Sequence, residues 1–86
     1  MTTVAAIKDR LAALQPAHLD VIDDSAQHAG HIDARDGGGH YRIHIVSERF
    51  AGLPTMARHR LVYDALGTLM EGAIHALSIT ARTPAE

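Results

Sequence analysis

The sequence contains no cysteine. That absence excludes disulfide bonds, zinc sites built wholly from thiolates, and cysteine nucleophiles within the chain. Aromatic residues are scarce as well, because the 86 residues include two tyrosines, one phenylalanine and no tryptophan. Since 47% of the residues are nonetheless hydrophobic, aliphatic side chains and alanine must form the core. We expect one small globular domain spanning residues 1–86.

Features typical of membrane and secreted proteins are also missing. No apolar run approaches the roughly 18 residues that a membrane-spanning helix needs. The first residues lack the charged-then-apolar order of a signal peptide. These absences predict a cytoplasmic protein without a membrane partner.

The chain has no excess of basic residues either. Eight lysines and arginines face ten aspartates and glutamates, which gives a formal net charge of −2. A dedicated nucleic-acid-binding domain usually carries a basic surface, so this balance counts against that class without excluding it. What the chain has in excess is histidine, at seven positions. Neutral imidazole is a common metal ligand, so the placement of these histidines becomes the central question.

The spacing of apolar residues predicts two helices. The first is capped by Thr2 or Thr3 and ends before Pro16, because proline disfavours helical backbone in the preceding residue. The second covers residues 55–71, with its first threonine as the cap and Gly72 in the left-handed stop position. Apolar residues three and four apart form the two stripes: Val4, Ile7, Leu11 and Leu14 in the first helix, and Ala57, Leu61, Ala65 and Leu69 in the second.

Three segments predict strands, namely residues 18–25, 40–47 and 74–82. In the second of these, apolar and polar residues alternate strictly, so one face should pack on helices and the other should meet solvent or a partner. The residues from 26 to 39 predict a loop, because three consecutive glycines and many polar side chains fit neither the helical nor the strand pattern of apolar residues.

The element order α-β-β-α-β predicts an α+β fold. The first two strands should form an antiparallel hairpin, while the second and third, joined through a helix, should run parallel. Both helices can then cover one face of a three-stranded mixed sheet.

This topology predicts that histidines meet at one edge of the sheet. Parallel strands begin at the same edge, where His40 starts the second strand and His75 starts the third. Alternation puts His75 at the start of the apolar face of its strand. The loop that carries His28 and His31 ends at His40. We therefore expect His28, His31 and His75 to form a metal site.

Several imidazoles at one edge suit a borderline or soft metal. Iron–sulfur clusters usually take thiolate ligands, but histidine can replace cysteine on one iron. Because this chain has no cysteine, the remaining ligands of such a cluster would come from another molecule. A cluster shared between two molecules is therefore more plausible than one held by this chain alone.

The other histidines have simpler interpretations. His18 and His44 fit ordinary polar positions on strands, and His59 fits a solvated position near the start of the second helix. The glycine run at 37–39 leads into a strand and lacks the phosphate-binding pattern, so it predicts a flexible hairpin loop.

Several segments together resemble the BolA family. They cover nearly the whole chain, and the segments at 58–63 and 74–79 are the most specific. The segments are DDSAQH at 23–28, HYRIHIVS at 40–47, FAGL at 50–53, RHRLVY at 58–63 and IHALSI at 74–79, followed by RTP at 82–84.

The resemblance implies a small fold similar to a type II KH domain and partnership with a monothiol glutaredoxin. In such heterodimers a 2Fe–2S cluster is held by the glutaredoxin cysteine, by glutathione and by the BolA-like protein. The histidine ligand of the family matches His75 here. The second ligand lies in the variable loop and matches His28, with His31 as the nearby alternative. The implied role is a non-catalytic adaptor for cluster trafficking or iron sensing, monomeric or weakly dimeric alone.

The alternative function is a DNA-binding transcriptional regulator of stress response or cell morphology, as described for some family members. Arg58, His59 and Arg60, together with Arg42, could form a local basic patch. Against this, the chain has no G-x-x-G loop between two helices, which KH domains use to clamp nucleic acid. Nothing in the sequence indicates an enzyme, because no nucleophile is aligned with a base.

Overall fold

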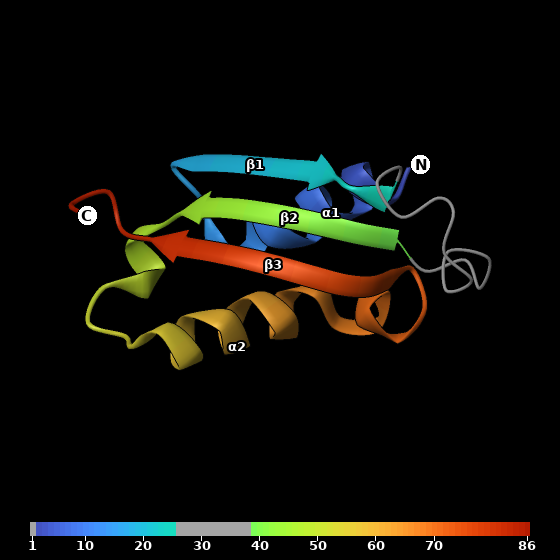
Figure 1. The fold of residues 1–86 in the computed structure, drawn as a ribbon. Helices are drawn as coiled ribbons and strands as arrows, with labels where there is room; N and C mark the ends of the chain where they lie inside the picture. Colours follow the sequence, from blue (N-terminus) through green and yellow to red (C-terminus); the bar gives the residue numbers. More distant parts are fainter. Residues whose placement is uncertain (1, 26–38) are drawn as a thin grey trace.

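The computed structural model describes residues 2–25 and 39–86 of the chain. Figure 1 shows two helices and a three-stranded sheet in the order expected from the sequence. The elements are α1 (Thr3–Leu11), the 3₁₀ turn η1 (Ala12–Leu14), β1 (His18–Asp23), β2 (Gly39–Val46), the 3₁₀ turn η4 (Glu48–Phe50), α2 (Thr55–Leu66), the 3₁₀ segment η5 (Gly67–Glu71) and β3 (Ile74–Arg82).

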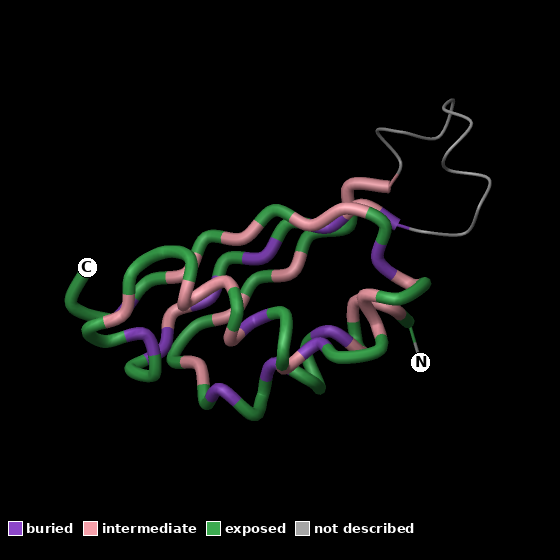
Figure 2. Tube along the Cα trace, turned by 90° about the horizontal axis from the view of Figure 1, so that it is seen from below, coloured by how far each residue is buried: buried purple, intermediate pink, exposed green. Residues whose placement is uncertain are grey.

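The sheet has the order β1-β2-β3, with β2 in the centre. Strands β1 and β2 pair antiparallel, and β2 and β3 pair parallel, which confirms the expected mixed sheet and the α+β class. Figure 2 shows both helices on one side of the sheet. Among the described residues no helix covers the other side, which we call the open face.

The core lies between the helices and the sheet. Alternation along β2 buries Tyr41, Ile43 and Ile45 toward the helices, as the sequence pattern predicted. Burying one large aliphatic or aromatic side chain contributes about 1.5–3 kcal/mol, so these positions dominate the stability of so small a domain. The buried apolar residues that they join include Ile7, Leu11, Leu14, Phe50, Val62, Leu66 and Ile74.

The first helix forms as expected and is fastened to the sheet at its end. Thr2 is the cap, and its Oγ1 accepts a hydrogen bond of 3.0 Å from the backbone N–H of Ala5. The hydroxyl of Ser47, which follows β2 and is almost fully buried, donates to the carbonyl of Leu14 at 2.7 Å. This bond satisfies a carbonyl at the end of η1 and ties the helical segment to the sheet.

The second helix is shorter than the sequence predicted. It ends at Leu66 and continues as the 3₁₀ segment η5, because Gly67 adopts a positive φ of 54° that terminates the α-helix. The guanidinium of Arg10 donates to the carbonyl of Leu66 at 3.2 Å, which satisfies one acceptor that the break leaves free. The left-handed stop predicted at Gly72 is wrong, since its φ is −160°.

The expected threonine cap of this helix is also wrong. Thr55 is the first helical residue, and Pro54 occupies the cap position without a side-chain hydrogen bond. Proline before the first turn restricts the backbone there, so the helix starts by conformational preference and not through a capping hydroxyl.

Candidate functional site

Two histidines from separate strands meet where β2 and β3 begin. The imidazole rings of His40 and His75 have centroids 5.3 Å apart and are tilted by 47°. The parallel pairing of the two strands brings these rings together, as the topology predicted. We call this place, defined by His40 and His75, the histidine edge.

The position of His75 depends on an irregularity that the sequence did not reveal. Gly39 faces Ile74, whereas His40 faces Ala76, so His75 is an extra residue in β3 with no facing partner. Such a bulge redirects the side chains around it. Ile74 therefore fills the core and His75 is exposed. The prediction that His75 starts the apolar face of its strand is wrong, although its location at this edge is confirmed.

A close backbone packing holds β2 at the histidine edge. A Cβ atom added to Gly39 would lie 2.5 Å from the ring atom Cε2 of Tyr41 and 2.6 Å from its hydroxyl oxygen. Only glycine leaves room for the buried Tyr41 ring beside this backbone. The N–H of Gly39 also donates to the carbonyl of Ala73 at 3.1 Å, which fixes the start of β3 next to it.

The end of β1 is held at the same place. The N–H of His40 donates to the hydroxyl oxygen of Ser25 at 3.1 Å, and the N–H of Asp24 donates to the carbonyl of His40 at 2.8 Å. Ser25 also donates its N–H to Asp23 at 2.8 Å, and its hydrogen bonds lower the pKa of the Asp23 carboxyl. The residues on either side of the 26–38 segment are therefore fixed beside the histidine edge.

The predicted ligands His28 and His31 lie outside the described residues. Their approach to His75 stays a prediction. What the structure does give is the anchoring of Ser25 and Gly39, the residues that flank the segment carrying both histidines, next to His40.

The chemistry of the histidine edge fits one part of a metal centre. His75 is exposed, and within residues 2–25 and 39–86 its side chain makes no hydrogen bond or ion pair. An imidazole in this state can offer a nitrogen to a metal. The chain provides no thiolate, and iron in a 2Fe–2S cluster needs several. The donor set therefore fits histidine ligation of a cluster that another molecule completes.

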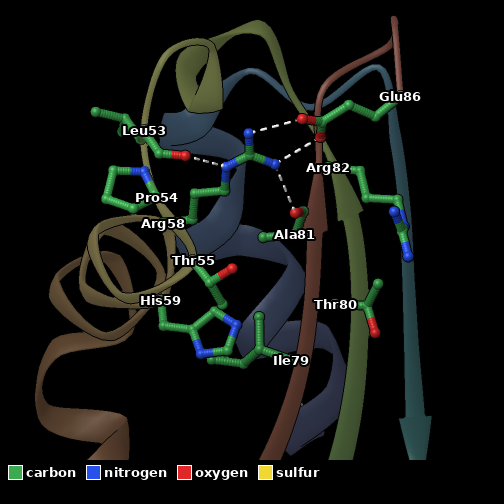
Figure 3. Close-up of a pocket in the computed structure, with 10 residues that line it drawn as sticks. All are labelled: Leu53, Pro54, Thr55, Arg58, His59, Ile79, Thr80, Ala81, Arg82 and Glu86. Atoms are coloured by element: carbon green, nitrogen blue, oxygen red, sulfur yellow. Dashed lines mark hydrogen bonds and ion pairs between the residues drawn. The ribbon is translucent and has the colours of Figure 1, made fainter.

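The residues of the DNA-binding alternative do not form one patch. Arg42 lies on the open face and donates through Nε and Nη2 to the carboxylate of Asp24. Arg58 lies on α2, against the end of β3, as Figure 3 shows. Its guanidinium donates to the carbonyls of Leu53 at 2.7 Å and Ala81 at 3.1 Å.

Arg58 also forms a two-point ion pair with the carboxylate of Glu86, with distances of 2.6 and 2.8 Å. Its side chain is only 13% exposed. The charge of Arg58 is therefore paired with a carboxylate of the same domain. On the same helix His59 is half-buried and Arg60 is exposed. The four residues named for nucleic-acid binding thus lie on opposite sides of the sheet, with two of their three guanidinium groups in ion pairs.

A second group of histidines, which sequence reasoning treated as ordinary surface residues, lies on the open face. His18 and Asp20 of β1 meet His44 of β2 there. Alternation puts His18 and Asp20 on one face, but only the register of β1 on β2 shows that His44 is the partner of Asp20.

Comparison with known proteins identifies the family. The family model described as BolA-like protein matches residues 11–86. The chain belongs to the BolA family. It is 47% identical over 78 residues to "SufE-like protein 1, chloroplastic/mitochondrial" from Arabidopsis thaliana, which covers 85% of this chain and 21% of that protein. It is 43% identical over 83 residues to BolA-like protein 1 from Bos taurus, covering 95% of this chain and 59% of the relative.

The solved structures agree with this BolA assignment. The BolA domain of SufE1 from Arabidopsis thaliana superimposes with a TM-score of 0.86 at 43% identity, covering 99% of this chain and 95% of that one. The resemblance inferred from the sequence segments is therefore confirmed, as is the BolA fold. The chain spans about a fifth of the first of these two curated relatives and under two thirds of the second.

No helix in the described part of this BolA-family chain is long and apolar enough to cross a membrane. The Arabidopsis relative is named as a chloroplastic and mitochondrial protein. The expected cytoplasmic location therefore stays a prediction.

Proposed function

We propose that this chain is a non-catalytic adaptor that binds a monothiol glutaredoxin and contributes histidine ligands to a shared 2Fe–2S cluster. The observation that carries the proposal is the histidine edge. There, His75 is exposed, and its ring centroid lies 5.3 Å from that of His40. Both histidines lie beside Ser25 and Gly39, which flank the 26–38 segment that carries His28 and His31. Membership of the BolA family supports the same role.

The division of ligands follows from the composition. With no cysteine, this chain supplies no thiolate, so in this proposal the thiolates come from the glutaredoxin and from glutathione. His75 is the first ligand in this proposal. His28 is the second, with His31 as the alternative on the same segment. Histidine ligation raises the reduction potential of a cluster relative to ligation by thiolates alone, which suits a carrier or sensor.

The fold suits an exchangeable ligand. His75 is an extra residue in an edge strand, and its side chain is exposed, so a partner can approach it without unfolding the core. The hydrogen bond of 3.1 Å from the Gly39 N–H to the Ala73 carbonyl holds the start of the strand from which this side chain projects. A fixed ligand loses less conformational freedom when the cluster binds.

The test is to mix the pure chain with a monothiol glutaredoxin that carries its cluster and glutathione. A shared cluster should change the visible absorption and circular dichroism spectra, and a heterodimer should elute on gel filtration. The variant His75→Ala should weaken or abolish the new spectrum. A matched control, His59→Ala, removes a histidine on α2 away from the histidine edge and should behave like the wild type. Unchanged spectra without a heterodimer would overturn the proposal.

Separate variants decide the second ligand. If His28 ligates the cluster, His28→Ala should alter the spectrum as His75→Ala does, while His31→Ala should not. The reverse result would assign His31. A spectrum unchanged in both variants would show that the segment contributes no ligand.

A further inference from the structure

We propose a second metal site on the open face, formed by His18, Asp20 and His44, that binds zinc or a similar divalent transition ion. Each of the three side chains offers one ligand atom, and these atoms all lie within 4.8 Å of one another. This site involves none of the residues of the histidine edge and does not depend on the function proposed above.

The sheet itself assembles the three ligands. His18 and Asp20 are two apart on β1, so their side chains project from the same face. Asp20 faces His44 directly across the antiparallel pair. Facing residues on neighbouring strands have Cβ atoms about 4.5–5.5 Å apart, and both strands are held by their hydrogen-bond ladder. The backbone positions are therefore fixed before any ion binds.

The side chains are already close to one another. Nε2 of His18 lies 2.8 Å from Oδ2 of Asp20, and the rings of His18 and His44 have centroids 5.7 Å apart in an edge-on arrangement. In a tetrahedral zinc site with bonds of about 2.0–2.1 Å, ligand atoms lie roughly 3.3 Å apart. The exposed side chains of His18 and Asp20, at 55% and 56%, can make that small adjustment.

The donor set also matches the ion. Two imidazoles and one carboxylate suit zinc and its neighbours in the first transition row. Three protein ligands leave one position for water or for a ligand from a partner. Asp20 supplies the one anionic ligand of the three. The nearby cation Arg42 is paired with Asp24, which limits its repulsion of an incoming ion.

Binding requires one rearrangement. The hydrogen bond between Nε2 of His18 and Oδ2 of Asp20 must open so that both atoms can face the ion, and the neutral His18 ring then carries its proton on Nδ1.

The test is a titration of the full chain with zinc chloride alone, followed by nitrogen NMR of the histidine side chains. The ring nitrogens of His18 and His44 should shift, and in a carbon spectrum the Asp20 carboxyl signal should shift with them. By calorimetry, His44→Gln should bind zinc at this site about tenfold more weakly or worse. The matched control His59→Gln should keep the wild-type affinity.

The signals of individual residues distinguish zinc bound at this site from zinc bound at the histidine edge. Shifts confined to His28, His31, His40 or His75 would overturn the proposal, and so would a His44→Gln variant that titrates like the wild type. Should the variant fail to fold, the wild-type spectra decide the matter by themselves. A further check is that His18→Gln leaves the shared cluster with glutaredoxin unchanged.

Discussion

His75 stands next to His40 because β3 carries one residue more than β2 at the start of their pairing. Gly39 faces Ile74 and His40 faces Ala76, which leaves His75 between the two pairs, exposed and with its ring centroid 5.3 Å from that of His40. A regular register would have continued the alternation and turned His75 toward the helices. The bulge therefore turns what would be a core position into an exposed one, where the proposed ligand His75 lies.

Gly39→Ala should destabilise the domain and disturb the histidine edge. The new methyl group would lie 2.5 Å from Cε2 of the Tyr41 ring, which is buried. We expect a loss of about 1–3 kcal/mol in the free energy of unfolding, as for other overpacked sites. Chemical denaturation measures this loss. The control Gly72→Ala meets nothing within 4 Å and should change stability by less than about 0.5 kcal/mol.

The Gly39 prediction has a specific internal check. If the clash is with the Tyr41 ring, Gly39→Ala should cost less in a Tyr41→Leu background than in the wild type. Equal costs in both backgrounds would show that the ring is not the cause.

Ser47→Ala should destabilise the chain by about 1–3 kcal/mol. The buried hydroxyl donates to the carbonyl of Leu14 at 2.7 Å and accepts from the N–H of Arg49 at 3.1 Å, so its removal leaves both groups without this partner. Thermal or urea unfolding gives the value. Ser78→Ala, at an exposed position of β3, is the matched control and should be close to neutral. Equal effects of the two substitutions would contradict the assigned role of Ser47.

The ion pair of Arg58 and Glu86 should make the free energy of unfolding depend on pH in the acid range. The hydrogen bonds from Arg58 and the Thr83 N–H lower the pKa of the Glu86 carboxyl from 4.5 to about 2. A carboxyl whose pKa is lower in the folded state than in the unfolded state stabilises the fold at pH values above the unfolded-state pKa. That contribution is lost as the pH falls through the folded-state pKa. The stabilisation should therefore be complete above pH 4.5 and disappear as the pH approaches 2.

Unfolding measured from neutral pH down to about pH 2 tests the Glu86 prediction. The wild type should be more stable than Glu86→Gln near neutral pH, and the two curves should converge in acid. Glu71→Gln changes an exposed glutamate of η5 and controls for the loss of one negative charge. A difference between wild type and Glu86→Gln that does not vary with pH would show that this pair does not titrate as described.

Most of the fold could be predicted from the sequence because each element has a strong pattern. Strict alternation identified β2, and the linking helix required β2 and β3 to run parallel. The ends of α2 could not be predicted as well. A glycine inside a helical pattern is tolerated or terminates the helix according to its φ, and at Gly67 that angle is 54°, beside the long-range hydrogen bond from Arg10 to the Leu66 carbonyl.

The candidate sites were predictable only in part. The topology alone placed His75 at the edge where β2 begins, but the bulge that exposes it has no signature in the sequence. The group of His18, Asp20 and His44 depends on which residue of β2 faces Asp20. A shift of one residue in that register would turn His44 to the other face, so no reading of a single strand could have found the group.

The most direct test of the shared-cluster account is pulsed electron paramagnetic resonance on the reduced complex with a monothiol glutaredoxin. Only this chain would carry ¹⁵N-labelled histidine. The account predicts ¹⁵N hyperfine coupling from imidazole bound to iron, and the coupling that His75 contributes should be lost in His75→Ala and retained in His59→Ala. A reduced complex that shows no histidine nitrogen coupling, or the same coupling without His75, would contradict it.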